Sequence, residues 1–145
     1  MRFSNVLSAL SPLREVETVS AHCDLMCGVY NPAQARIEAE SVHQIAVKYQ
    51  DSDDETFRQR AVIIKEERAD LVKHHLWVLW TDYFKPNHVE EYPQLHQLFW
   101  EATKAAGDAK KTMDPKAGED LLAKIDEIAD IFWKTKGGKP DWMTS

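Results

Sequence analysis

The chain has 145 residues, 43% of them hydrophobic, which is enough for one domain with a buried core. Its formal net charge of −6 argues against nucleic acid as a partner and gives an anionic substrate no attraction to the molecule as a whole. No apolar run approaches the ~18 residues of a membrane span, so we also expect no membrane partner.

Residues 1–21 differ in kind from the rest of the chain. A short apolar run at 6–10 is interrupted by Pro12 and followed by three charged residues. A secretory signal needs a longer apolar region without such charges before the cleavage site. We therefore expect a removable pro-peptide and a cytoplasmic protein. Export stays an alternative, because Val19-Ser20-Ala21 resembles a small-residue cleavage site.

Residues 22–30 contain both cysteines of the chain, in the order HCDLMCGVY. If the chain is cut before His22, the free amine of His22, the backbone amide nitrogen of Cys23 and the Cys23 thiolate form two adjacent five-membered chelate rings. Cys27 adds a fourth, in-plane sulfur, and the imidazole of His22 reaches the same metal from above. Planar ligation by nitrogen and thiolate suits Ni(II) or Cu(II), not zinc or magnesium. We call residues 22–30 the hook.

The remaining sequence predicts helices. Asn31-Pro32 is typical of a helix start, and Asp54 ends a loop as a capping acid. The first helix is expected to bury a face with i, i+4 spacing, made of Ile37, Ser41, Ile45 and Tyr49. The second is expected to end before Pro86 and to bury Phe57, Ala61, Ile64, Leu71, Val78 and Leu79.

Two further helices complete the prediction. One starts near Val89 or Pro93, and the other starts at Asp114-Pro115 and ends before Gly137. Their predicted buried residues are Leu95, Leu98, Phe99, Ala102, Ala106, Leu121, Leu122, Ile125, Ile128 and Phe132. We expect an all-α, antiparallel four-helix bundle over residues 31–136 and a loose tail at 137–145. Four tryptophans should lie in the core or at a subunit interface: Trp77, Trp80, Trp100 and Trp133.

The hook and several later segments together resemble nickel-containing superoxide dismutase in its unprocessed form. The later segments read NPAQARIEAES at 31–41, KEER at 65–68, KHH at 73–75, LWTDYFKP at 79–86, YPQLHQL at 92–98 and IFW at 131–133. The likeness covers roughly residues 22–136. Met26 stands where the family hook usually has proline, and Asn31 stands where aspartate is usual.

The resemblance implies an enzyme that converts two superoxide anions and two protons to dioxygen and hydrogen peroxide. It implies one nickel ion per chain, cycling between Ni(II) and Ni(III) on His22, Cys23 and Cys27. It also implies a homohexamer and a processing peptidase that cuts between Ala21 and His22.

The same resemblance assigns roles around the metal. Glu38 and Arg68 correspond to residues that hold the axial imidazole, the usual way of orienting a metal ligand. Without the family likeness, they are simply an ion pair of the bundle. Tyr30, Asp24 and Tyr83 correspond to residues at the open face of the metal, where access is limited to small anions.

Lys85 is a candidate for steering superoxide to the entrance, although a solvated lysine is the commoner fate of such a residue. Two rival functions remain open on the sequence alone. One is a nickel- or copper-binding protein without turnover, and the other is a metal-free thiol redox switch formed by Cys23 and Cys27.

Overall fold

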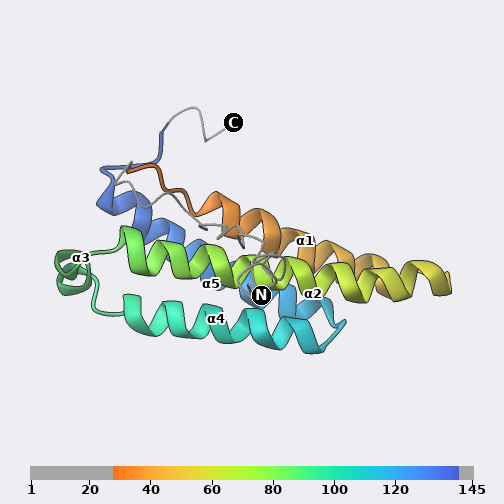
Figure 1. Ribbon diagram of the computed structural model, residues 1–145. Coiled ribbons are helices and arrows are strands. Elements are labelled where there is room, and N and C mark those ends of the chain that lie inside the picture. The colour runs from red at the N-terminus through yellow and green to blue at the C-terminus, as the bar shows by residue number, and fades with distance from the viewer. Residues whose placement is uncertain (1–27, 141–145) are drawn as a thin grey trace, which may run out of the picture.

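The computed structural model describes residues 28–140, and helices are the regular secondary structure of this part of the chain, with no strand. Four long helices lie side by side in Figure 1. In chain order the elements are α1 (Ala33–Gln50), α2 (Glu55–Val78), the π-helix η1 (Leu79–Tyr83), α3 (Pro86–Glu91), α4 (Leu95–Lys111) and α5 (Pro115–Thr135). The predicted all-α bundle is confirmed.

Local capping explains where three of these helices begin. The side chain of Asn31 accepts a 2.9 Å hydrogen bond from the backbone of Ala33 at the start of α1. Asp54 accepts from Thr56 at 2.9 Å, and Asp114 accepts from Lys116 at 2.9 Å. Each side chain satisfies a backbone N–H that has no partner within the helix.

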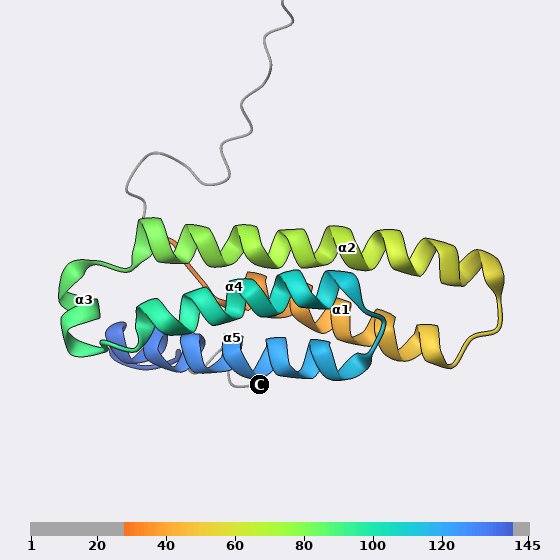
Figure 2. The ribbon, with the colours of Figure 1, turned by 90° about the horizontal axis from the view of Figure 1, so that it is seen from below.

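The four long helices form an antiparallel ring. α1 packs against α2 and α5, and α4 packs against the same two helices. Figures 1 and 2 show the end of α5 and the short α3 at one end of the bundle, and the chain enters α1 from this end. Residues 28–30, the described part of the hook, contact residues that follow α2 and α5 at this end, Tyr83 and Lys136.

The buried face of α1 differs from the predicted one. The side chains that α1 buries are Ala35, Ala39, Val42 and Ala46, whereas Ile37 is 64% exposed. α1 lies so close to α5 that an added methyl group on Gly118 would stand 2.7 Å from the His43 backbone. Only small side chains fit such a contact. The alanine face of α1 is therefore buried against the bundle, and the larger apolar residues are not.

The predicted buried face of α2 is right at Ala61 and Leu79 but wrong at Ile64, and it misses most of the buried stripe. Ile64 is 37% exposed, and the buried residues are Ala61, Lys65, Ala69, Val72 and Leu76. A periodicity search that counts only apolar side chains misses this stripe, because a lysine stands in its middle. The predicted core residues of α4 are buried, and so are those of α5 except Leu122, which is partly buried.

The connection between α2 and α4 is more ordered than predicted. α2 continues into the π-helix before the chain becomes extended at Phe84 and Lys85. Pro86 forces that extended conformation on the residue before it and then opens α3 as the first helical residue. A separate helix therefore begins only at Leu95. Within the described residues, no helix is both long and apolar enough to cross a membrane.

Candidate metal centre

The described chain includes the last three residues of the hook, at the end of the bundle. Gly28 has φ of 71°, a left-handed conformation that glycine adopts without the steric cost of a side chain. The predicted ligands lie outside the described residues, as do Asp24 and Met26. The structure therefore describes where the hook joins the bundle.

Tyr30 and Tyr83 meet although 53 positions separate them in the chain. Their ring centroids are 5.7 Å apart, with the ring planes inclined at 54°. Tyr30 belongs to the hook and Tyr83 to the last turn of the π-helix. The structure thus brings together two of the three residues predicted at the open metal face.

The phenol of Tyr83 is held from several sides. Its hydroxyl lies 2.6 Å from Oγ1 of Thr135, which in turn donates to the carbonyl of Phe132 at 2.7 Å. The Tyr83 ring packs on Phe132 with centroids 4.4 Å apart and stacks on His88 at 5.6 Å. Sequence reasoning missed Thr135 and His88, because no periodicity links them to Tyr83.

Lys136 is a further neighbour that the sequence did not single out. Its amine donates to the carbonyl oxygen of Gly28 at 3.4 Å. The same amine lies 5.1 Å from the centroid of the Tyr83 ring and 5.9 Å from that of Phe132, within the range of cation–π attraction. The only sequence signal was a lysine directly before the glycines that follow the last helix.

Glu38 and Arg68 form an ion pair between α1 and α2, the contact expected of them without the family likeness. The Arg68 guanidinium lies 3.2 and 3.4 Å from the two carboxylate oxygens of Glu38. The Glu38 side chain is 17% exposed and that of Arg68 is 37% exposed. A partly buried carboxylate with a fixed cation on one side can still accept a hydrogen bond from an imidazole on another.

His75 stands near the same carboxylate. Burial, together with the neighbouring His74, lowers the pKa of His75, while the charge of Glu38 acts in the opposite direction. Burial and His74 therefore both favour the neutral form of the His75 imidazole. Arg68 is then the cation that balances Glu38.

Lys85 follows the aromatic cluster closely in sequence, yet its amine makes a different contact. Nζ donates to the carbonyl of Asp82 at 2.7 Å, at the end of the π-helix. The side chain is exposed. This geometry leaves its predicted steering role untested.

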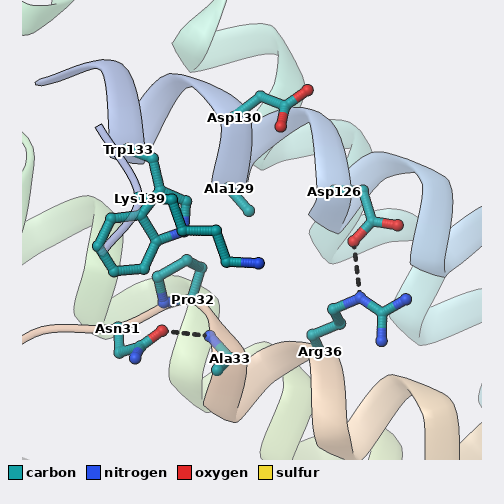
Figure 3. Close-up of a pocket in the computed structure, with 9 residues that line it drawn as sticks. All are labelled: Asn31, Pro32, Ala33, Arg36, Asp126, Ala129, Asp130, Trp133 and Lys139. Atoms are coloured by element: carbon teal, nitrogen blue, oxygen red, sulfur yellow. Dashed lines mark hydrogen bonds and ion pairs between the residues drawn. The ribbon is translucent and has the colours of Figure 1, made fainter. Parts of the chain in front are cut away.

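A cavity of about 590 Å³ opens beside the start of α1, next to the hook (Figure 3). Trp133 and Lys139 stand on one side of it, and Arg36 donates to Asp126 at 2.8 Å on the other. The lining residues are Asn31, Pro32, Ala33, Arg36, Asp126, Ala129, Asp130, Trp133 and Lys139. The lining carries two carboxylates and two cations, and Arg36 is already paired with Asp126, so the cavity has no excess positive charge to attract superoxide.

Metal-ligating side chains do not gather elsewhere in the described part of the chain. In residues 28–140, no three or more His, Cys, Asp or Glu side chains are arranged to hold a metal ion. Both cysteines of the chain are in the hook.

Comparison with known proteins supplies the family. The sequence model of the family described as nickel-containing superoxide dismutase matches residues 17–136. The chain is 58% identical over 119 residues to the nickel superoxide dismutase of Streptomyces coelicolor, covering 82% of this chain and 91% of the relative. It is 60% identical over 118 residues to that of Streptomyces seoulensis, covering 81% and 90%.

Solved structures agree with the sequence relatives. The crystal structure of nickel-containing superoxide dismutase with nickel ligation corresponding to the oxidized state superposes with a TM-score of 0.78 at 58% identity, covering 81% of this chain and 100% of that one. The apo structure of nickel superoxide dismutase gives a TM-score of 0.74 at 54% identity, covering 77% and 100%.

The class to which fold and sequence point is an all-helical metalloprotein, with a helical bundle preceded in sequence by a segment that contains both cysteines. The family match over most of the chain makes the assignment specific: the chain belongs to the nickel-containing superoxide dismutase family. It is an oxidoreductase that dismutates superoxide, and its cofactor is nickel.

Proposed function

We propose that the chain becomes active once residues 1–21 are removed by a peptidase that cuts between Ala21 and His22. One nickel ion would then be held by the new amine and the imidazole of His22, the amide nitrogen of Cys23 and the thiolates of Cys23 and Cys27. This donor set fits nickel, because planar nitrogen and thiolate ligation suits Ni(II). Bound there, nickel supplies one-electron redox chemistry between its divalent and trivalent states.

The protein's own groups prepare this site. Deprotonation of both thiols is required for ligation, so loading depends on pH. Glu38, held by Arg68 at 3.2 Å, accepts a hydrogen bond from the His22 imidazole and fixes its orientation. That role is supported by the partial burial of the Glu38 carboxylate between α1 and α2.

Substrate access is the role we assign to Tyr30, Tyr83 and Asp24. The two rings pack together at 5.7 Å, at the point where the hook joins the bundle. Such a wall limits access to small anions such as superoxide. Lys85 adds positive charge near this entrance and raises the local concentration of superoxide.

We also propose that the enzyme is a homohexamer. Six large apolar side chains are prominently exposed on the single described chain: Val29, Ile37, Ile63, Ile64, Trp77 and Trp100. Several large apolar side chains exposed on neighbouring helices are typical of a surface that another subunit covers. We place the enzyme in the cytoplasm, because charges and Pro12 interrupt the only apolar run of residues 1–21.

The observation that carries the proposal is the hook itself, which has the family's ligand residues at its N-terminus and ends beside Tyr83. Three chains should be compared after loading with nickel: the full chain, one that begins at Ala21 and one that begins at His22. We expect superoxide turnover only from the chain that begins at His22, because an amide nitrogen there cannot replace the free amine.

Two substitutions complete the test. Cys23→Ser and Cys27→Ser, each in the chain that begins at His22, should abolish turnover, since a hydroxyl does not replace thiolate donation to nickel. Full turnover by the unprocessed chain, or by both serine variants, would show that the metal site lies elsewhere.

A further inference from the structure

Lys136 lies where the hook, the π-helix and the end of α5 meet. It is the first residue after α5, and its amine reaches back across 108 positions of sequence to the carbonyl of Gly28 at 3.4 Å. The same amine lies 5.1 Å from the centroid of the Tyr83 ring. One side chain therefore contacts both the hook and the tyrosine against which the hook packs.

Hydrogen bonds hold the backbone at Lys136 and the neighbouring Tyr83 in place. The Lys136 backbone N–H donates to the carbonyls of Phe132 and Trp133, both at 3.2 Å. Thr135, the residue before it, holds the hydroxyl of Tyr83 at 2.6 Å. A cation at this position is also favoured by the C-terminal end of the α5 dipole.

The contact on the hook side is equally specific. Gly28 turns the chain in the left-handed region, with φ of 71°, directly after the predicted ligand Cys27. The carbonyl of Gly28 therefore lies one residue after the last predicted metal ligand. A hydrogen bond to this carbonyl holds the end of the loop without competing for a metal ligand.

Among the described residues, the Lys136 amine contacts the carbonyl oxygen of Gly28 and the faces of Tyr83 and Phe132, which are all uncharged. Lys85, in contrast, uses its amine on the carbonyl of Asp82, at the end of its own helix. Lys136 is therefore the better placed of the two cations to act on the hook.

We propose that Lys136 is a positioning residue that latches the end of the hook to the bundle and holds Tyr30 against Tyr83 before nickel binds. The proposal rests on the nickel site described above. A hook that is already in place loses less conformational freedom when the metal binds, so the latch strengthens nickel binding. Lys136 itself touches neither the metal nor the reacting atoms.

The test uses the chain that begins at His22 and three variants of it. Lys136→Met keeps most of the side-chain length but removes the donor and the charge. Lys136→Arg keeps both and suits aromatic faces. Lys134→Met is the matched control, since it removes the same charge from the last turn of α5 but lies about 200° away around the helix.

The first measurement needs no metal. Cross-relaxation between ring protons of Tyr30 and Tyr83, measured by NMR in the metal-free protein, reports whether the hook is latched. We expect these cross-peaks in the unsubstituted chain, in Lys136→Arg and in Lys134→Met, and their loss in Lys136→Met. Cross-peaks that persist in Lys136→Met overturn the proposal.

The second measurement is a titration with nickel chloride. We expect Lys136→Met to bind nickel about fivefold more weakly, the effect of one lost hydrogen bond of about 1 kcal/mol, and the other two variants to match the unsubstituted chain. Unchanged affinity in Lys136→Met overturns the latch, and so does an equal loss in Lys134→Met, which would indicate a general effect of charge. If the unsubstituted chain binds no nickel, the nickel site itself fails, while the NMR comparison still decides the latch.

Discussion

The carboxylate of Glu38 illustrates how much depends on a single side chain. It is 17% exposed and lies 3.2 Å from Arg68, so its charge is balanced on one side only. We expect Glu38→Gln to keep the shape of the site but to orient the His22 imidazole poorly. Superoxide turnover of the nickel-loaded enzyme should fall about tenfold, as is typical when the partner of a metal ligand is lost.

Stability should respond far less than activity to this change. Arg68 is 37% exposed, and ion pairs of this kind are worth roughly 0–1 kcal/mol once solvent screening is counted. Asp126→Asn, which breaks the exposed pair with Arg36, provides the control for a general loss of surface charge. Equal turnover in Glu38→Gln and Asp126→Asn would show that Glu38 does not orient the His22 imidazole.

Met26 is the residue at which the hook departs most clearly from the family pattern, and it lies outside the described residues. A cis bond before proline costs about 0.5–1 kcal/mol, whereas one before methionine costs about 2.5–4 kcal/mol. If the hook closes with a cis bond, Met26→Pro should tighten nickel binding or speed hook assembly without changing the ligands. Side-by-side nickel titration of the two processed chains checks this, and weaker binding in the proline variant would indicate a different closed geometry.

The helices depend on two contacts that are not simple apolar packing. Lys65 is 1% exposed, and its amine donates to the carbonyls of Ala109, Lys110 and Thr112 at the end of α4. These carbonyls have no backbone N–H partner within the helix. The Lys65 amine supplies the donors that a further helical turn would have provided. The interaction fastens α2 to the end of α4.

Lys65→Met should therefore lower the free energy of unfolding by about 3 kcal/mol, because buried carbonyls lose their donor. Denaturant unfolding of the purified chain measures this. Lys110→Met is the control, since it removes only the exposed pair with Asp70 and should cost less than about 1 kcal/mol. Similar losses in both variants would mean that the buried contacts contribute no more than a surface pair.

Gly118 sets the distance between α1 and α5. A methyl group there would lie 2.7 Å from the backbone Cα of His43, which cannot move without shifting a helix. We expect Gly118→Ala to cost about 1–3 kcal/mol, as overpacking does. Gly107→Ala on α4 is the matched control, because the new methyl group would meet only the flexible Lys73 amine, at 3.2 Å, and should be neutral or stabilising. Thermal unfolding of both variants distinguishes a steric effect from a general glycine effect.

At the scale of the whole molecule, the exposed apolar side chains bear on whether the chain forms an oligomer. Ile37 is 64% exposed on α1, although it belongs to the stripe that the sequence predicted to be buried. If subunits cover this surface, Ile37→Asp should reduce the molecular mass measured by light scattering to that of a smaller oligomer, with the helical content unchanged. Lys48→Asp introduces the same side chain at an exposed polar position of α1 and should leave the mass unchanged. An unchanged mass in Ile37→Asp would exclude this surface from the interface.

Much of this protein was determined by its sequence alone. Capping at Asp54 and Asp114, the apolar periodicity of α4 and α5 and the spacing of ligands in the hook are local features, because each depends on residues within a few positions. Such features predict helix starts, the helical fold and the chemistry that the hook can perform. Without the family likeness, Glu38 and Arg68 are expected to form an ion pair of the bundle, and the structure shows that pair. Their role toward the His22 imidazole came from the resemblance and stays a prediction.

The features that depend on the distance between helices were decided by the tertiary structure. The close approach of α1 to α5 selected the alanine face over Ile37, since only small side chains fit there. The buried place of Lys65 follows from the open end of α4, 44 positions away. Lys136 likewise reaches Gly28 only because the bundle returns the end of α5 to the hook. No sequence period encodes contacts of this kind, because they form between residues far apart in the chain.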